Sequence, residues 1–221
     1  MSTKFYATLN SYIETLLTEF GQIPDDRQAQ LKELAHYIQS CLEQNKAVQL
    51  NFICTHNSRR SHISQIWAYA AAYYFGLENV HCFSGGTEAT AFNPRAVAAM
   101  KRAGFHIEKS TIGRNPQYQV YCCDNISPIE AFSKTYDDPS NPQSDFAAVM
   151  TCNHADTNCP FIPGAKRFAL TYEDPKVADD TGEETDRYDE RVRQIGRELF
   201  FMMSLFVVEV EDEIVEAVAA S

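Results

Sequence analysis

Short, continuous runs of apolar residues alternate along the chain with stretches whose apolar residues recur at helical spacing. The continuous runs predict four buried strands, at residues 47–53, 79–83, 146–150 and 167–171. Helical stretches at 63–75 and 93–104 separate the first three strands, and Asn93 followed by Pro94 is a typical helix start. Because alternating strands and helices favour a parallel sheet, we predict an α/β fold.

The two ends of the chain show helical spacing without strands. Residues 1–46 predict two helices in a hairpin, with Asp25 or Asp26 as the cap of the second. We favour helices that cover the domain; a dimerisation or partner surface is the alternative. Residues 182–208 predict a long amphipathic helix. The remaining residues are acidic and then rich in Ala and Val, and they either continue this helix or fray. The predicted division is a helical extension at 1–46, a catalytic-type domain at 47–208 and a tail at 209–221.

Residues 115–145 interrupt the alternation. Apolar positions at 118–123 and 129–132 predict a β-hairpin inserted into the domain, followed by a loop rich in Pro and Asp. Cys122 and Cys123 are neighbours, so in a strand they would point to opposite faces, and we predict that both serve packing.

The stretch that carries chemistry follows the first predicted strand. Cys54 ends this strand, and Arg60 with Ser61 opens the next helix. The loop between them consists of Thr55, His56, Asn57, Ser58 and Arg59. Backbone N–H groups of such a loop, together with the helix N-terminus, suit a tetrahedral oxyanion, and Arg60 can add a bidentate clamp. The same positive field favours the thiolate of Cys54, its reactive form, while Asn57 suits a left-handed turn and can tie the loop through its side chain.

The charge balance limits the partners. The 221 residues include 19 basic and 30 acidic side chains, which gives a net charge of −11. Nonspecific binding to nucleic acid is therefore not expected, and an anionic substrate must rely on a local positive pocket. The first residues lack a signal-peptide pattern, and the longest apolar run, 199–208, is too short to span a membrane. With an odd number of cysteines, seven, we expect reduced thiols and a cytoplasmic protein.

From about residue 47 to residue 206, these landmarks resemble the low-molecular-weight protein tyrosine phosphatase superfamily. Four motifs of that superfamily are matched: the loop by Cys54, Asn57, Arg60 and Ser61; a turn by Ser84, Gly86 and Thr87; a helix start by Asn93, Pro94, Ala96 and Val97; and an acid by Asp174 and Pro175. Within the superfamily the chain is similar to the thioredoxin-coupled arsenate reductases, because Cys152 and Cys159 lie seven apart and Pro160 follows the second.

The resemblance implies a parallel sheet in a three-layer α/β/α fold and a role for each matched residue. Cys54 is the expected nucleophile, Arg60 the oxyanion clamp, and Asp174 the general acid. Asp138, also followed by Pro, is a competing acid, which we disfavour because Asp174 follows the last strand as in the family. His56 and Arg59 depart from the family loop, which usually has Gly and Cys there. His56 can change the loop or add a cation, and Arg59 can face solvent or enlarge the positive pocket.

The two further cysteines imply a disulfide relay. In it, Cys152 attacks the Cys54 adduct, Cys159 then attacks Cys152, and thioredoxin reduces the disulfide. If the segment between them is helical, their Cα atoms lie about 10 Å apart. A disulfide spans about 4.4–6.8 Å, so that segment would have to unwind. The alternative is half of a zinc site with His154, which we disfavour because no second Cys or His pair completes a tetrahedral set.

Three functions therefore stay open. The first is an arsenate reductase that uses thioredoxin, without a metal or other cofactor. The second is a phosphatase that hydrolyses phosphotyrosine or small phosphate esters through a phosphocysteine, and the third is a catalytically weak oxyanion-binding regulator. A homodimer is compatible with all three, and no partner is expected among nucleic acids or membranes.

Overall fold

The computed structural model describes residues 5–158 and 161–219; for residue 158 and residues 207–219 it describes the backbone alone. Four parallel strands form the central sheet, in the order β2-β1-β6-β7. They are β1 (Val48–Cys54), β2 (Val80–Gly86), β6 (Phe146–Met150) and β7 (Ala165–Ala169). The apolar runs predict these four strands correctly, although β2 runs three residues further and β7 begins two residues earlier than expected. The predicted α/β fold class is confirmed.

A second, antiparallel sheet has the order β3-β4-β5. Its strands are β3 (His106–Lys109), β4 (Tyr118–Tyr121) and β5 (Ile129–Ala131). The predicted inserted hairpin is therefore present, and β3 adds a strand that the sequence does not predict. Cys122 and Cys123 lie just beyond the end of β4, so the argument from opposite faces of a strand does not apply to them. Both are nevertheless buried in the main core, as packing residues are.

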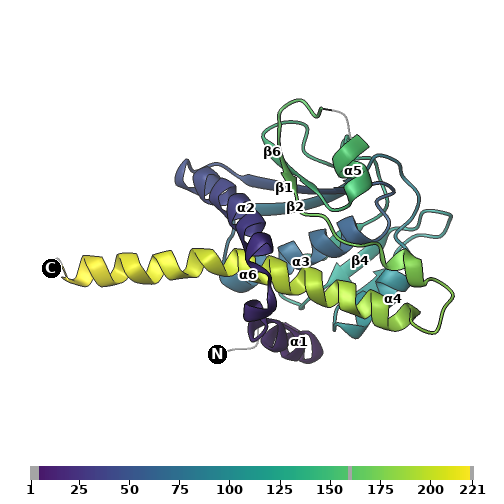
Figure 1. Cartoon of the computed structure of the whole chain (residues 1–221), viewed down its shortest axis with the longest axis horizontal. Coiled ribbons are helices and arrows are strands. Elements are labelled where there is room, and N and C mark those ends of the chain that lie inside the picture. Colours follow the sequence, from purple (N-terminus) through teal and green to yellow (C-terminus); the bar gives the residue numbers. More distant parts are fainter. Residues whose placement is uncertain (1–4, 159–160, 220–221) are drawn as a thin grey trace.

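Helices α2 (Asp25–Glu43) and α3 (Arg60–Phe75) pack against one face of the central sheet, and α6 (Glu184–Ala219) packs on α3 (Figure 1). Helices α1 (Ala7–Leu17) and α4 (Pro94–Arg102) pack against α6. The predicted hairpin of α1 and α2 is wrong, because each packs against α6, which runs between them. The predicted cap is also wrong: Pro24 holds the cap position, and Asp25 and Asp26 lie in the first turn. Helix α6 continues through the tail to Ala219.

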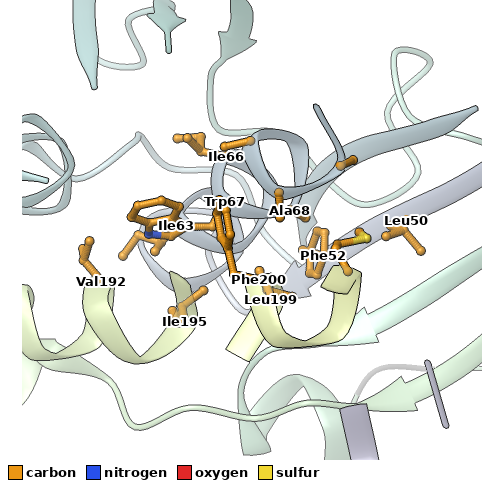
Figure 2. Close-up of a cluster of buried hydrophobic side chains, with 14 of the residues drawn as sticks. Leu50, Phe52, Ile63, Ile66, Trp67, Ala68, Val192, Ile195, Leu199 and Phe200 are labelled. Carbon is orange, nitrogen blue, oxygen red and sulfur yellow. The ribbon is translucent and has the colours of Figure 1, made fainter. Parts of the chain in front are cut away.

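The helical face of the sheet packs into a core centred on Trp67 (Figure 2). Leu50 and Phe52 of β1 point toward α3 and α6, because alternate residues of a strand face the same side. Trp67 of α3 is fully buried and meets Phe105 and Phe200 edge to face, with ring centroids 4.9 and 5.8 Å apart. This packing fixes α3 on β1, and α3 begins at the loop that follows β1.

The opposite face of the sheet has a thinner cover. Helix α5 (Asn153–Asn158) and the segment 133–145 lie over it, and a small buried cluster includes Ile53, Met150 and Cys152. The buried side chain of Asn51 donates to the Tyr136 backbone carbonyl at 3.1 Å, which ties this segment to β1. Within the described residues, no helix is both long and apolar enough to cross a membrane.

Candidate active site

The loop between β1 and α3 holds the Cys54 sulfur against a hydroxyl group. Cys54 is 4% exposed, and its Sγ lies 3.1 Å from Ser61 Oγ. Asn57 Nδ2 donates to the same Ser61 oxygen at 2.9 Å. Since the Ser61 oxygen already accepts this bond, its own proton is available to the sulfur. A hydroxyl donor directed at sulfur stabilises a thiolate both as a nucleophile and as a leaving group.

Asn57 fixes the shape of the loop. Its φ of 42° lies in the left-handed region, as the sequence predicts, and its Oδ1 accepts from the backbone N–H of Lys134 at 2.9 Å. Gly86, at the end of β2, allows the loop backbone to approach this strand closely. A Cβ at this position would lie 2.6 Å from the Asn57 nitrogen and 2.8 Å from the Thr55 carbonyl oxygen. The Thr87 N–H donates to the Cys54 carbonyl at 3.1 Å. The loop is thus built against the end of β2.

Arg60 binds the segment that carries Asp174. Its Nη2 donates to Asp174 Oδ2 at 2.6 Å, and its Nη1 donates to the Tyr172 backbone carbonyl at 2.9 Å. Asp174 also accepts from the Lys176 N–H, which caps the short 3-10 helix η2 (Pro175–Ala178). The competing acid, Asp138, instead accepts hydrogen bonds from Ser140 within its own turn. Of the two Asp-Pro pairs, Asp174 is therefore the one in contact with the loop arginine.

Arg59 turns toward α6. Its Nε donates to the Tyr188 hydroxyl at 2.6 Å, and its Nη2 contacts Asp179 Oδ2 at 3.0 Å. Burial raises the pKa of Tyr188 to about 12, so its hydroxyl keeps its proton and donates it to Asp179 Oδ1 at 2.8 Å. The guanidinium thus neither faces solvent nor stays free to enlarge an oxyanion pocket; it joins the start of α3 to the segment beyond Asp174.

Thr55 connects the loop to the second cysteine. Cys152 follows β6 and is 1% exposed, and its Sγ lies 3.5 Å from Thr55 Oγ1. The same hydroxyl lies 3.3 Å from His154 Nδ1, and Cys152 Sγ accepts from the Ala155 N–H at 3.3 Å. Cys159 lies outside the described residues. In the described part of the chain, no group of three or more His, Cys, Asp and Glu side chains could hold a metal ion.

The other predicted loop residues have different surroundings. The His56 side chain is half exposed, and its Nε2 lies 3.8 Å from Glu88 Oε2. Its backbone carbonyl accepts from Ser133 Oγ at 2.9 Å, so the loop is also tied to the segment after β5. Ser58 is buried, and its carbonyl accepts from the N–H of Asn93, the cap of α4.

The sequence does not identify several residues that support the site. Asp179, Tyr188 and Lys134 carry no motif that would connect them to the loop. His62 directly follows Ser61 and is fully buried, with its Nδ1 3.3 Å from Ser84 Oγ. Burial, and after it the positive charge of Lys134, lowers the pKa of His62 to about 3, so this imidazole is neutral.

The fold and the loop together define the class of protein. A cysteine ends a central parallel strand, a hydroxyl donor faces its sulfur, and the next helix begins with an arginine. Chemically, this arrangement suits a cysteine nucleophile that acts on a tetrahedral oxyanion.

Comparison with known proteins gives the family. The chain is 32% identical over 157 residues to an arsenate reductase of Halalkalibacterium halodurans, a match that covers 70% of this chain and 94% of the relative. It is also 32% identical over 150 residues to an arsenate reductase of Bacillus subtilis, covering 67% of this chain and 89% of the relative. The chain belongs to the arsenate reductase family. No family model matches it.

Solved structures of related folds give weaker matches. A YwlE mutant from Bacillus subtilis matches 72% of this chain and 98% of its own, with a TM-score of 0.47 and 15% identity. An arsenate reductase from Archaeoglobus fulgidus matches 71% of this chain and 99% of its own, with a TM-score of 0.44 and 16% identity.

Proposed function

We propose that this chain is an arsenate reductase that transfers electrons from thioredoxin to arsenate through Cys54, Cys152 and Cys159. The observation that carries the proposal is the contact between the buried Cys152 thiol and Thr55, the residue directly after Cys54. A phosphatase needs no second cysteine at this place, whereas a reductase needs a thiol that can reach the adduct. The 32% identity to the arsenate reductases of Halalkalibacterium halodurans and Bacillus subtilis supports the same proposal.

In the first step, arsenate enters the loop and Arg60 changes partner. Arg60 is paired with Asp174, so the incoming oxyanion competes with this carboxylate for the guanidinium. The planar fork of arginine can bind two oxygens of the anion, and the loop N–H groups bind the third. Asp174, once released, stays beside the site as a group that can carry a proton.

In the second step, the Cys54 thiolate attacks arsenic and an oxygen leaves as water. Asp174 supplies a proton to the leaving oxygen, and Arg60 with the loop amides binds the charge that develops. Ser61 then hydrogen-bonds the sulfur of the Cys54–arsenic bond, and so prepares it to accept the next nucleophile.

In the third step, the Cys152 thiolate attacks the sulfur of Cys54. The bond between sulfur and arsenic breaks, and its electron pair stays with arsenic, which leaves as arsenite. Helix α5 begins at Asn153 and continues to Asn158, so the segment between Cys152 and Cys159 is helical over these residues. Since a helix holds its ends too far apart for a disulfide, α5 must unwind before Cys159 can attack Cys152. This helix is short and includes Asn153, Asp156 and Thr157, whose residue types have modest helix propensity, so it unwinds at low cost although Ala155 is buried. The resulting disulfide is then within reach of thioredoxin.

A coupled assay tests the proposal. Arsenate should cause consumption of NADPH when thioredoxin and thioredoxin reductase are present, and Cys159→Ser should stop turnover after one round. In that variant, mass spectrometry should find a Cys54–Cys152 disulfide, while hydrolysis of an aryl phosphate stays nearly unchanged. If arsenate produces no disulfide in the wild-type protein, the reductase proposal fails.

A phosphatase is the second candidate, and the pairing of Asp174 with Arg60 favours it as much as it favours a reductase. The same loop and acid can form and hydrolyse a phosphocysteine. Rapid hydrolysis of phosphotyrosine without any arsenate reduction would establish this alternative, and an absence of both reactions would point to an oxyanion-binding regulator. Because the relay uses free thiols and thioredoxin, we infer a cytoplasmic location.

A further inference from the structure

The hydroxyl of Thr55 lies between the Cys152 thiol and the His154 imidazole. Its Oγ1 is 3.5 Å from Cys152 Sγ and 3.3 Å from His154 Nδ1. A hydroxyl has one proton, so Thr55 can donate to one of these neighbours only. If His154 Nδ1 accepts that proton, the Thr55 oxygen is left to accept from the thiol of Cys152. The three groups then form a hydrogen-bonded chain that points from sulfur to imidazole.

We propose that His154 takes up, through Thr55, the proton that Cys152 loses when it attacks Cys54; this rests on the proposed reductase function. In the step, the thiol proton moves to the Thr55 oxygen, and the Thr55 proton moves to His154 Nδ1. The Cys152 sulfur forms a bond to Cys54 Sγ, and the bond between Cys54 and arsenic breaks with its electron pair on arsenic. Two thiols are oxidised to a disulfide, arsenic is reduced by two electrons, and imidazolium holds the proton.

Burial explains why this thiol needs a proton acceptor. Cys152 is 1% exposed and lies in an apolar cluster with Ile53 and Met150, so bulk water cannot take its proton directly. Only the thiolate is a nucleophile, so the thiol proton of Cys152 must leave as the attack proceeds. His154 is exposed, so it can pass the proton on to solvent. The Ala155 N–H, at 3.3 Å from Cys152 Sγ, remains in place to stabilise the thiolate.

The charged groups around the hydrogen-bonded chain of Cys152, Thr55 and His154 are paired with one another in the structure. Asp156 of α5 contacts Arg167 of β7 at 3.0 Å, and Asp174 contacts Arg60 at 2.6 Å. His56, the other histidine of the loop, faces Glu88 at 3.8 Å. Asp156, which is bound to Arg167, is a weak proton acceptor. Asp174 leaves Arg60 when the oxyanion enters, but the Thr55 hydroxyl contacts Cys152 and His154 and not Asp174. The side chain of His154 is therefore the acceptor that the geometry offers.

The test measures the attack of Cys152 by itself. In a Cys159→Ser background, formation of the Cys54–Cys152 disulfide is followed after a single addition of arsenate, by acid quench and mass spectrometry, across a range of pH. His154→Asn keeps an oxygen near the position of Nδ1 but cannot take up a proton. We expect this substitution to slow disulfide formation by about 10-fold or more and to make the rate keep rising toward the pH at which a free thiol ionises, about 8.5.

Two variants of Thr55 distinguish a role in proton transfer from a role in packing alone. Thr55→Val removes the hydroxyl and should give the same loss and the same pH profile as His154→Asn, with no further loss when the two are combined. Thr55→Ser keeps the hydroxyl and should restore most of the rate. His36→Asn, on the exposed side of α2, is the matched control and should behave as the background does.

The outcomes distinguish this proposal from the proposed function. If the background protein forms no disulfide with arsenate, the reductase function fails. If it does, and His154→Asn shows an unchanged rate and pH profile, the proton chain is overturned. Hydrolysis of an aryl phosphate does not involve Cys152, so an equal loss of that activity in His154→Asn would show general damage to the site and would also overturn the proposal.

Discussion

At the scale of single residues, the loop depends on Asn57. Its backbone is left-handed, and its side chain bonds both Ser61 and the Lys134 N–H. Asn57→Gly removes both bonds but keeps the conformation, whereas Asn57→Ala also adds left-handed strain. We expect the alanine variant to lower the free energy of unfolding by about 1 kcal/mol more than the glycine variant, measured by urea unfolding. Equal losses would show that the loop changes conformation to avoid the strain.

The two neighbouring arginines should differ in effect. Arg60→Lys keeps the charge but loses the planar fork, so we expect kcat/KM for arsenate to fall by about 100-fold. Arg59→Ala should affect activity less and instead lower the free energy of unfolding by about 1–3 kcal/mol, because Asp179 and Tyr188 lose their buried partner. Steady-state kinetics and urea unfolding of both variants check this. Equal losses of activity would mean that the loop arginine has been misassigned.

How far the site could be predicted depends on where its residues lie in the chain. Cys54, Asn57 and Arg60 lie within seven residues of one another, so their spacing alone indicates an anion-binding loop. The partners that fix this loop come from distant segments: Lys134 is 77 residues from Asn57, and Tyr188 is 129 residues from Arg59. No local pattern connects them, because tertiary folding alone brings them together.

At the scale of elements, helix α6 meets α3 at a glycine. A Cβ on Gly196 would lie 2.9 Å from the Trp67 ring and 3.0 Å from the end of Leu16. Gly196→Ala would gain about 1 kcal/mol of helix propensity, but overpacking against a rigid ring costs about 1–3 kcal/mol. We expect a net loss in the free energy of unfolding of about 1 kcal/mol, measured in urea. Gly182→Ala is the control, since nothing lies within 4 Å of its Cβ position. If Gly196→Ala raised the free energy of unfolding, the contact between α6 and the Trp67 ring would not be too tight for a methyl group.

The elements that the sequence predicts correctly are those with a strong local pattern. The two middle strands of the central sheet, β1 and β6, are buried at nearly every position because both of their faces are covered, and this gives them strong apolar runs. Strand β3 is missed because one of its four residues is buried and the other three are exposed. The arrangement of α1 and α2 is mispredicted for a different reason. Their apolar faces are evident, but the helix that covers both, α6, begins about 140 residues after α2 ends.

At the scale of the whole molecule, one buried core joins the ends of the chain to the sheet. It contains Leu9 of α1, Leu31 of α2, Leu50 of β1 and Leu199 of α6. The loop and Cys54 lie where β1 leaves this core, so the position of the nucleophile depends on segments from both ends of the chain. A change in the stability of the core should therefore be measurable as one cooperative transition that includes the site.

The pH dependence of this transition should be governed in part by His62. Its pKa is about 3 in the folded protein, chiefly because of burial, and about 6.5 in an unfolded chain. Between these values the unfolded chain binds a proton that the folded protein excludes, so stability falls as the pH falls, by up to about 1.4 kcal/mol per pH unit. The lowered pKa values of Asp138 and Glu184 act in the same direction but at lower pH, near and below the ordinary values of 3.8 and 4.5.

Urea unfolding between about pH 6.5 and 5 should thus show a free energy of unfolding that falls with falling pH. His62→Gln should reduce the slope of this dependence, whatever the effect of the substitution on stability at pH 7. An identical slope in both proteins would mean that His62 becomes protonated without unfolding, and that the buried contact with Ser84 opens to water.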